Sequence, residues 1–218
     1  LTTGGVLEKG KILGGQTRLI KTGDVVYIPS GLPHGGSGVG KNITWLNVRW
    51  DTDWPADSPM GAGTLNGILG RAGGGRGRGP ALPAGSQQVL PYSYGGSGEL
   101  FFSKETLEQI MAGMRLKKST NTRLIEGGRY NVNLRWNGTP TAEVHEQTTD
   151  TWYVVAGGGT VNTGFERKDG ARVPNTGVSV ATKPGDVFFH PSNFSHGFSE
   201  TSPDIFWLNI RWDDNYAK

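Results

Sequence analysis

Alternation of apolar and polar residues predicts that most of this chain is β-strand. In residues 129–136, RYNVNLRW, apolar side chains alternate with asparagine and arginine, which is the period of a strand. Short runs rich in β-branched and aromatic residues recur at TWYVV, GTVNTG, GVSVAT, DVFFH and FWLNIRW. Glycine, proline and asparagine separate these runs and indicate turns between them. The pattern predicts an all-β fold of many short strands.

One segment has the period of an α-helix instead. Residues 103–116, SKETLEQIMAGMRL, place apolar side chains at the i, i+3, i+4 and i+7 spacing of one helix face, at Leu107, Ile110, Met111 and Met114. Ser103 is a good N-cap for such a helix. We expect a short helix that packs its apolar stripe against the outside of the β structure.

The chain contains an internal repeat. Residues 22–54 align without gaps with residues 184–216, at a constant offset of 162, and 15 of the 33 positions are identical. GDVVYIPSGLPHGGSG corresponds to GDVFFHPSNFSHGFSE, and ITWLNVRWD corresponds to IFWLNIRWD. The repeat predicts that two parts of the chain fold alike.

Two blocks carry histidines beside these predicted strands. In PGDVFFHPSNFSH, Gly185, Pro191 and His196 have the spacing G-x5-P-x-x-x2-H, with Asn193 between the proline and the histidine. This block resembles the second motif of the cupin superfamily, in which a glycine is usual at the position of Asn193. In the repeat, the corresponding residues are Gly23, Pro29 and His34.

The other block, AEVHEQTTDTWYVVAGGG, resembles the first cupin motif. His145 matches that motif's first histidine, Asp150 its acidic residue and Gly157 its glycine, and Gln147 stands where a second histidine is usual. The resemblance implies an all-β cupin double-stranded β-helix, a jelly-roll barrel. With the helix added, we expect one complete and one partial barrel and one short α-helix.

The resemblance also implies a metal site. His145, Asp150 and His196 would be the ligands, with Gln147 as a fourth ligand or as a hydrogen-bond partner of Asp150. Two histidines and one carboxylate bind divalent iron in oxygenases, and the same set accepts manganese, zinc, nickel or copper. We therefore expect a divalent transition metal whose identity stays open. The implied function is a metal-binding bicupin, an oxygenase or isomerase acting on a small organic molecule. A non-catalytic ligand-binding or storage-type bicupin with a degenerate metal site is the alternative.

The repeat divides the chain into three predicted parts. Residues 1–54 correspond to the C-terminal half of a first cupin barrel, residues 55–102 to a Gly/Pro-rich connector, and residues 103–218 to the helix and a complete second barrel. His34 would be a metal ligand of the first barrel. We expect Leu1 to be a processed end and a separate chain or a second copy to complete the first barrel, so that the protein is an oligomer. The 55–102 connector is the alternative cover.

Further polar residues fall on the predicted strands. We expect His190 to be a polar pocket residue rather than a ligand. A shared pattern, Asn-x-Arg-Trp, recurs at 47–50, 133–136 and 209–212. Because tryptophan is the more natural core residue, we expect the tryptophan face to form the core and the asparagine and arginine face to be exposed to solvent. In the alternative, Asn209 and Arg211 lie inside the barrel and face a carboxylate ligand.

Composition excludes some classes of function. The net charge is only +3, which gives no strong electrostatic case for nucleic-acid binding. No apolar run approaches the length that spans a membrane. The chain has no cysteine, so disulfides, thiolate metal sites and cysteine nucleophiles are excluded.

Overall fold

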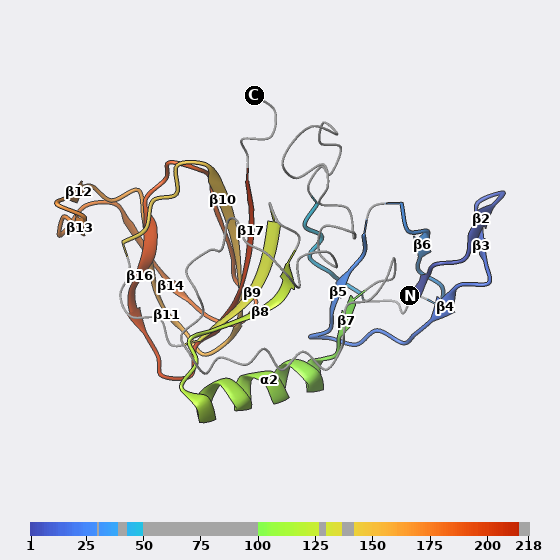
Figure 1. Cartoon of the computed structure of the whole chain (residues 1–218). Helices are drawn as coiled ribbons and strands as arrows, with labels where there is room; N and C mark the ends of the chain where they lie inside the picture. Colours follow the sequence, from blue (N-terminus) through green and yellow to red (C-terminus); the bar gives the residue numbers. More distant parts are fainter. Residues whose placement is uncertain (30, 39–42, 50–99, 127–129, 137–141, 214–218) are drawn as a thin grey trace, which may run out of the picture. The chain divides into compact units, whose positions relative to one another are not determined.

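The computed structural model of the chain describes residues 1–29, 31–38, 43–49, 100–126, 130–136 and 142–213 (Figure 1). The chain divides into two compact units, Leu1–Asp53 with Pro91–Ile110 and Trp54–Leu90 with Met111–Lys218. Most of the predicted connector, residues 55–99, lies outside the described residues. No helix of the described segments is long and apolar enough to cross a membrane.

The second unit consists of two antiparallel sheets and a small hairpin (Figure 1). The larger sheet has the strand order β15-β10-β17-β9-β8, the smaller one has the order β14-β11-β16, and β12 pairs with β13. The bounds are β8 (Asn121–Glu126), β9 (Tyr130–Trp136), β10 (Thr148–Ala156), β11 (Gly159–Thr163), β12 (Arg167–Lys168), β13 (Ala171–Arg172), β14 (Val178–Thr182), β15 (Val187–His190), β16 (His196–Thr201) and β17 (Phe206–Asp213).

The chain passes back and forth between these two sheets. It leaves the larger sheet after β10, forms β11 and β14 of the smaller sheet, returns at β15, crosses again to β16 and ends in β17. A buried cluster joins the two sheets, formed by Trp152 and Trp207 of the larger one, Val161 and Phe198 of the smaller one, and Ile205. This order is that of a double-stranded β-helix, so the predicted all-β fold class is confirmed for this part of the chain.

The predicted helix is present as α2 (Lys104–Lys117). The Ser103 hydroxyl accepts a hydrogen bond from the backbone N–H of Thr106 at 3.1 Å, which caps the first turn as expected. Leu107, Met111 and Met114 are buried. The boundary between the two units falls inside this helix, after Ile110.

Both faces of the larger sheet are covered, and this overturns one expectation. On one face, Trp136 stacks on Phe206 and Arg115 of α2 lies over the same phenyl ring, at 4.7 Å from its centroid. On the other face, Asn133 and Asn209 face each other across β9 and β17 and are only 6% and 5% exposed. The expectation that the asparagine and arginine face is exposed to solvent is therefore wrong for β9 and β17. Because α2 packs on the outer face, the apolar residues lie there and the polar ones lie inside.

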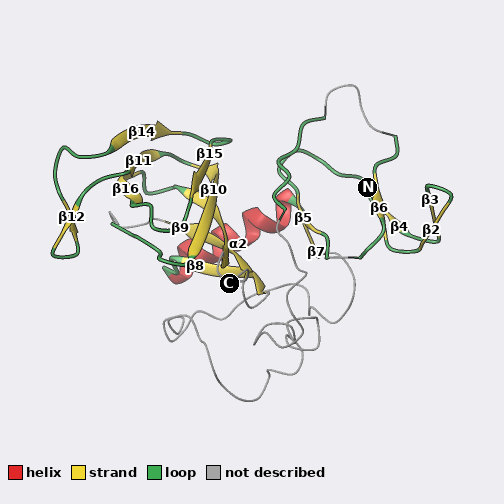
Figure 2. Cartoon of the chain, turned by 90° about the horizontal axis from the view of Figure 1, so that it is seen from above, coloured by secondary structure: helices red, strands yellow, loops and turns green. Residues whose placement is uncertain are grey.

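The first unit repeats the strand pairing of the second. Its sheet has the order β4-β1-β6, formed by β1 (Thr2–Thr3), β4 (Gln16–Thr17) and β6 (His34–Gly35), and a hairpin joins β2 (Val6–Glu8) to β3 (Lys11–Leu13). In the second unit, β14-β11-β16 and the hairpin β12–β13 have the same arrangement (Figure 2). Thr3 pairs with His34 as Thr163 pairs with His196.

The turns of the two units also agree in detail. Gly23 and Gly185 have φ of +92° and +94°, a conformation that favours glycine. After each of them an aspartate accepts a backbone hydrogen bond from the lysine three residues before it, Lys21 to Asp24 at 2.8 Å and Lys183 to Asp186 at 2.9 Å. The repeat in the sequence is thus a repeat in local structure.

One strand of the first unit has a substitute partner. β5 (Val25–Tyr27) pairs antiparallel with β7 (Leu100–Phe102), with Val26 opposite Phe101. In the second unit β15 pairs with β10, with Phe188 opposite Trp152. Residues 100–102, assigned to the connector from the sequence, therefore occupy the position that β10 holds in the second unit.

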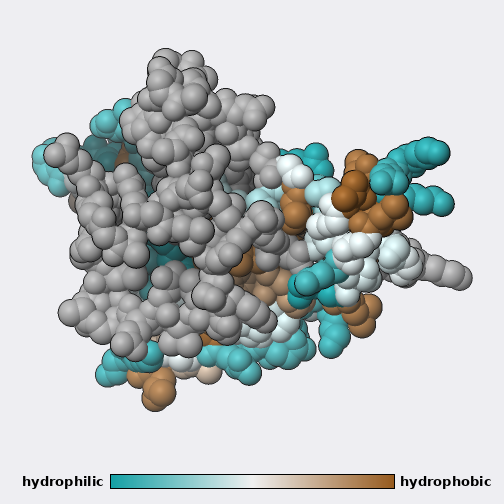
Figure 3. All heavy atoms as spheres, turned by 45° about the vertical axis from the view of Figure 1, so that its right-hand side comes forward, coloured by the Kyte–Doolittle hydropathy of each residue, from teal (hydrophilic) through white to brown (hydrophobic). Residues whose placement is uncertain are grey.

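Large apolar side chains of the first unit are exposed (Figure 3), at Val6, Leu7, Leu13, Leu19, Ile43, Trp45 and Leu46.

Candidate metal centre

The segment before β10 is held against β16 by backbone hydrogen bonds. Glu143 and His196 exchange two of them, with N···O distances of 2.9 and 3.0 Å. Asn193 donates its backbone N–H to the carbonyl of His145 at 2.7 Å, and it does so with φ of +60°. Asparagine is one of the few non-glycine residues that tolerate this conformation, which explains how it replaces the usual glycine. Since side chains alternate along an extended segment, Glu143 and His145 point to the same side.

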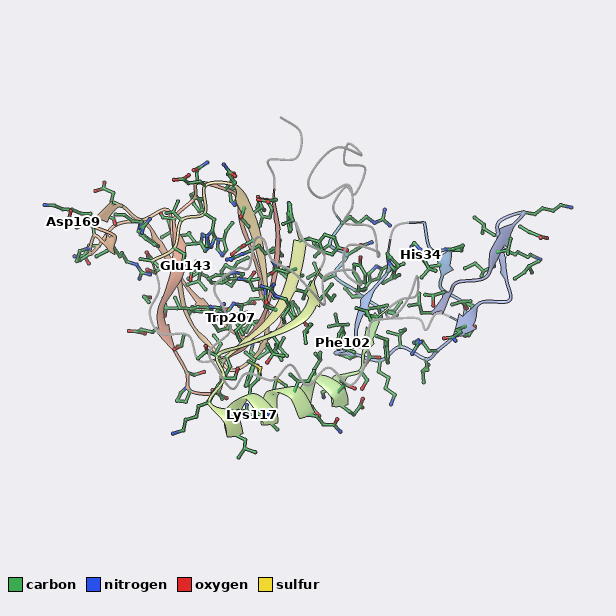
Figure 4. All side chains as sticks on the ribbon, in the orientation of Figure 1. His34, Phe102, Lys117, Glu143, Asp169 and Trp207 are labelled. Carbon is green, nitrogen blue, oxygen red and sulfur yellow. The ribbon has the colours of Figure 1, made fainter. Side chains whose placement is uncertain are left out.

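Four side chains from three segments meet at this place. Glu143, His145, Asp150 of β10 and His196 of β16 each offer a ligand atom, and these atoms all lie within 4.8 Å of one another. Asp150 is fully buried and His196 is 1% exposed. This is the one group of three or more histidine, aspartate or glutamate side chains with such geometry in the described part of the chain. Figure 4 labels Glu143 among the side chains of this unit.

Arg211 of β17 forms a two-armed ion pair with Asp150. Its Nε lies 2.7 Å from Oδ1 of the aspartate and its terminal nitrogen lies 2.9 Å from Oδ2. Asn209, two residues earlier on the same strand, donates to Oδ2 at 3.4 Å. Strand pairing produces this contact, because Asp150 is directly opposite Arg211 in the β10–β17 register.

His145 lies between the guanidinium and a second carboxylate. Its Nε2 is 2.8 Å from the terminal nitrogen of Arg211 and 3.2 Å from Oε2 of Glu143. One ring nitrogen cannot both accept from the guanidinium and donate to the carboxylate. The guanidinium is always a donor and makes the shorter contact, so we assign the proton to Nδ1 and the lone pair to Nε2. Arg211 thereby holds His145 in the tautomer that a metal ligand requires.

His196 is oriented in a similar way by the backbone. Its Nδ1 lies 2.8 Å from the carbonyl oxygen of Phe194, to which it donates. Its Nε2 is buried, has no hydrogen-bond partner in the described part of the chain, and lies 3.6 Å from Oδ2 of Asp150. A buried lone pair without a partner is costly in a protein interior, and a bound cation would remove that cost.

The two carboxylates of the group are ionised. Burial acts to raise the pKa of Asp150, but the two-armed contact with the guanidinium of Arg211 outweighs it and holds the pKa well below its usual range. The pKa of Glu143 is also below its usual range, and the positive charges of Arg135 and Arg211 contribute to this lowering. Both side chains are therefore ready to act as anionic ligands at neutral pH.

His190 lies beside this group. It is directly opposite Asp150 in the β10–β15 register, and its ring stacks on that of His196 at a centroid distance of 4.4 Å. Both of its ring nitrogens are buried, and neither has a hydrogen-bond partner among the residues that the structure describes. Burial, together with the nearby His196, lowers the pKa of His190 to about 4, so the ring is neutral at pH 7. The expected polar pocket residue is thus buried against the four-residue group and is not a member of it.

The structure brings His145, Asp150 and His196 together, whereas two other candidates lie elsewhere. Gln147 is exposed. His34 is also exposed, and its Nδ1 bonds to the carbonyl oxygen of Leu32 at 2.9 Å. Glu143 was missed from the sequence, although its position two residues before His145 was a signal that both side chains share one side of an extended segment.

Comparison with known proteins gives only structural matches. No protein-family model matches the sequence, and no curated protein matches it. Among solved structures, KdgF from Halomonas sp. is 20% identical with a TM-score of 0.35, over 43% of this chain and 76% of that one. An RmlC-like cupin from Shewanella frigidimarina is 21% identical with a TM-score of 0.32, over 43% and 74%. A Klebsiella pneumoniae protein with a double-stranded β-helix domain is 18% identical with a TM-score of 0.33, over 44% and 73%.

The second unit has the double-stranded β-helix fold. The order of its strands and the passage of the chain between its two sheets establish this. The four ligand atoms form a group that can hold a metal ion in this unit.

Proposed function

We propose that the second unit is a metal-binding cupin enzyme, with Glu143, His145, Asp150 and His196 as ligands of a divalent transition metal. The observation that carries this proposal is the meeting of four ligand atoms within 4.8 Å. Ligands at about 2.1 Å from a tetrahedral zinc ion are about 3.4 Å from one another. Small rotations of the four side chains would bring them to such distances.

The hydrogen bonds around the group support this assignment. The carbonyl of Phe194 fixes the ring of His196 through Nδ1, and Nε2 has no hydrogen-bond partner among the described residues. Metal-binding histidines in proteins donate their second ring nitrogen to a carbonyl or carboxylate in this way. Two carboxylate oxygens and two imidazole nitrogens suit iron, manganese, zinc, nickel or copper, and metal identity stays open.

Arg211 competes with a metal for two of the four ligands. Its terminal nitrogen takes the lone pair of His145 and one oxygen of Asp150, whereas its Nε bonds the other oxygen of the same aspartate. Metal binding requires the terminal nitrogen to leave, and it is compatible with the Nε contact. We infer that Arg211 keeps Asp150 in place with and without metal, and that it compensates the charge of Asp150 when no metal is bound.

The proposed reaction is an oxygenation or isomerisation of a small organic molecule. A bound divalent metal would polarise the substrate or dioxygen as a Lewis acid or redox centre. The protein would hold the carboxylates ionised, keep both histidines unprotonated at Nε2 and exclude water through the buried cluster around Trp152 and Trp207.

A non-catalytic ligand-binding unit is the second candidate. The two-armed contact between Arg211 and Asp150 favours it, because the guanidinium supplies a positive charge at the buried carboxylate without any metal. In this case the group is a degenerate metal site, and the interior binds a ligand without turnover.

Metal analysis separates the two candidates. Protein purified without chelators, and protein stripped with EDTA and titrated with Mn²⁺, Zn²⁺, Ni²⁺ or Fe²⁺, should bind close to one ion per chain. The double variant His145→Ala/His196→Ala should keep the circular dichroism spectrum of the wild type and lose the ion. An uptake below about a tenth of an ion per chain for every metal would favour the non-catalytic candidate. A full ion in the double variant would show that the ligands lie elsewhere.

A further inference from the structure

The interior face of the larger sheet is polar and basic over three neighbouring strands. Trp207 belongs to the buried cluster between the sheets, so the residues that alternate with it on β17, Asn209 and Arg211, also face the interior. The register extends this face across β9, where Arg135 is opposite Trp207 and Asn133 is opposite Asn209. On β8, Arg123 is opposite Asn133.

Two of the three arginines on this face have polar partners. Arg211 is paired with Asp150, and Arg123 donates from Nε to Oδ1 of Asn133 at 3.2 Å. Arg135 makes no hydrogen bond or ion pair with a described residue. Its guanidinium carbon lies 6.0 Å from the centroid of the Trp207 ring, which is a weak contact.

Arg135 is also held in an unfavourable electrostatic environment. Burial lowers the pKa of Arg135, and the charge of Arg211 lowers it further, whereas Glu143 and Asp150 act in the opposite direction. Burial and Arg211 lower the pKa of Arg123 as well. Arg211 therefore repels the guanidiniums of both Arg123 and Arg135 in a region from which water is partly excluded.

A bound metal would leave the charges around Arg135 unbalanced. Among the described residues, Glu143, Asp150 and Arg211 are the charges that act on Arg135, so two guanidiniums face two carboxylates. A divalent metal at the four-residue group would add an excess of two positive charges. An uncompensated charge in a protein interior is costly, and negative charge from a ligand would remove the cost.

We propose that this interior binds a small organic carboxylate, and that Arg135 binds a carboxylate group of the ligand beside the four-residue group. The planar fork of a guanidinium matches a carboxylate in two parallel hydrogen bonds. The charge excess with metal bound favours a dicarboxylate. The inference deepens the proposed function and rests on it for the metal, but the carboxylate subsite depends on Arg135 alone.

The matched control for Arg135 is Arg167. Arg167 lies in the exposed hairpin β12–β13 of the same unit, and Arg167→Gln removes the same charge as Arg135→Gln. Arg135→Lys keeps the charge and loses the planar fork. Thermal unfolding and near-ultraviolet circular dichroism of each variant verify its folding.

Calorimetric titration with malonate tests the proposal, using EDTA-treated protein and Zn²⁺-loaded protein. Malonamide is the neutral probe of the same shape, and inorganic phosphate is the probe for anions of another geometry. We expect malonate to bind wild-type protein more tightly than malonamide or phosphate. Arg135→Gln should raise the Kd for malonate about tenfold or more, the loss of one charge-assisted hydrogen-bonded pair. Arg167→Gln should leave it unchanged, and Arg135→Lys should fall between the two.

Several results would overturn the proposal. These are equal affinity for malonamide, tighter binding of phosphate, an equal Kd in the Arg135 and Arg167 glutamine variants, or no malonate binding at all. The comparison of EDTA-treated with Zn²⁺-loaded protein distinguishes failure of the metal proposal from failure of the carboxylate proposal. If zinc is not taken up but malonate binding still depends on Arg135, the metal assignment fails and the carboxylate subsite stands. If zinc binds and the Kd for malonate does not depend on Arg135, only the proposed carboxylate subsite is refuted. If Arg135→Gln does not fold, Arg135→Lys decides, because a carboxylate subsite requires it to bind malonate more weakly than Arg167→Gln does.

Discussion

Replacement of Arg211 by methionine should destabilise the metal-free protein strongly, and metal should reverse much of the loss. The aliphatic part of the arginine is kept in Arg211→Met, whereas the guanidinium that pairs with Asp150 is lost. Asp150 is fully buried, so the change leaves a carboxylate without its main cation. Breaking a buried pair from one side costs roughly 3–5 kcal/mol, and we expect about 3 kcal/mol because Arg211 is 30% exposed.

The stability difference between wild type and Arg211→Met should depend on pH in a definite direction. In the wild type the pKa of Asp150 is lowered by folding, so its contribution to stability is present above the unfolded pKa, about 4, and is lost as the pH falls. Without the guanidinium, burial dominates and the folded pKa rises above the unfolded one. Stability of the variant then decreases as the pH increases through about 4. The difference between wild type and variant should therefore widen from pH 4 to pH 7.

Urea unfolding of EDTA-treated protein at several pH values measures this difference, with Arg167→Met as the control for loss of an exposed arginine. Zn²⁺ at a hundredfold excess over its Kd adds about 2.7 kcal/mol to the stability of a protein that binds it only when folded. At the same zinc concentration the gain should be larger in Arg211→Met, because no guanidinium has to be displaced and the Kd is lower. A loss below about 1 kcal/mol at pH 7, or one that is the same at pH 4 and pH 7, would refute the role assigned to Arg211.

Two further predictions concern His190 and the first unit. His190→Leu should remove a pH dependence: folding lowers the pKa of His190 from 6.5 to about 4, so wild-type stability should fall by roughly 3 kcal/mol more than that of the variant between pH 7 and pH 4. Equal slopes in urea unfolding would contradict this. The exposed apolar side chains of the first unit should be covered by a second copy or a separate chain, so light scattering should give a mass above 23.4 kDa. A monomer that binds no hydrophobic dye would argue against such a cover.

The fold of the second unit could be predicted well from the sequence, for a clear physical reason. Its turns require particular residues, such as the glycine with positive φ at Gly185 and the asparagine at Asn193, and these residues set the spacing by which the strands and His196 are recognised. The helix was predictable because its apolar period and its Ser103 cap are local features.

The inward face of the strands could not be predicted in the same way. Alternation shows which residues share a face, but it does not show which face is the interior when both are buried. Here α2 covers the apolar side of β9 and β17, and the polar side with Asn209 and Arg211 lies within the unit. The contact of Arg211 with Asp150 and His145 depends on strand register, which sequence alone did not supply.

Anomalous diffraction from crystals grown with Zn²⁺ tests the central claim most directly. The account predicts one strong anomalous peak at the zinc edge, about 2.0–2.2 Å from Nε2 of both His145 and His196 and from a carboxylate oxygen of Asp150. The terminal nitrogen of Arg211 should have left His145, while its Nε still contacts Asp150. A peak at another place, or no peak with Arg211 still bound to both residues, would contradict the account.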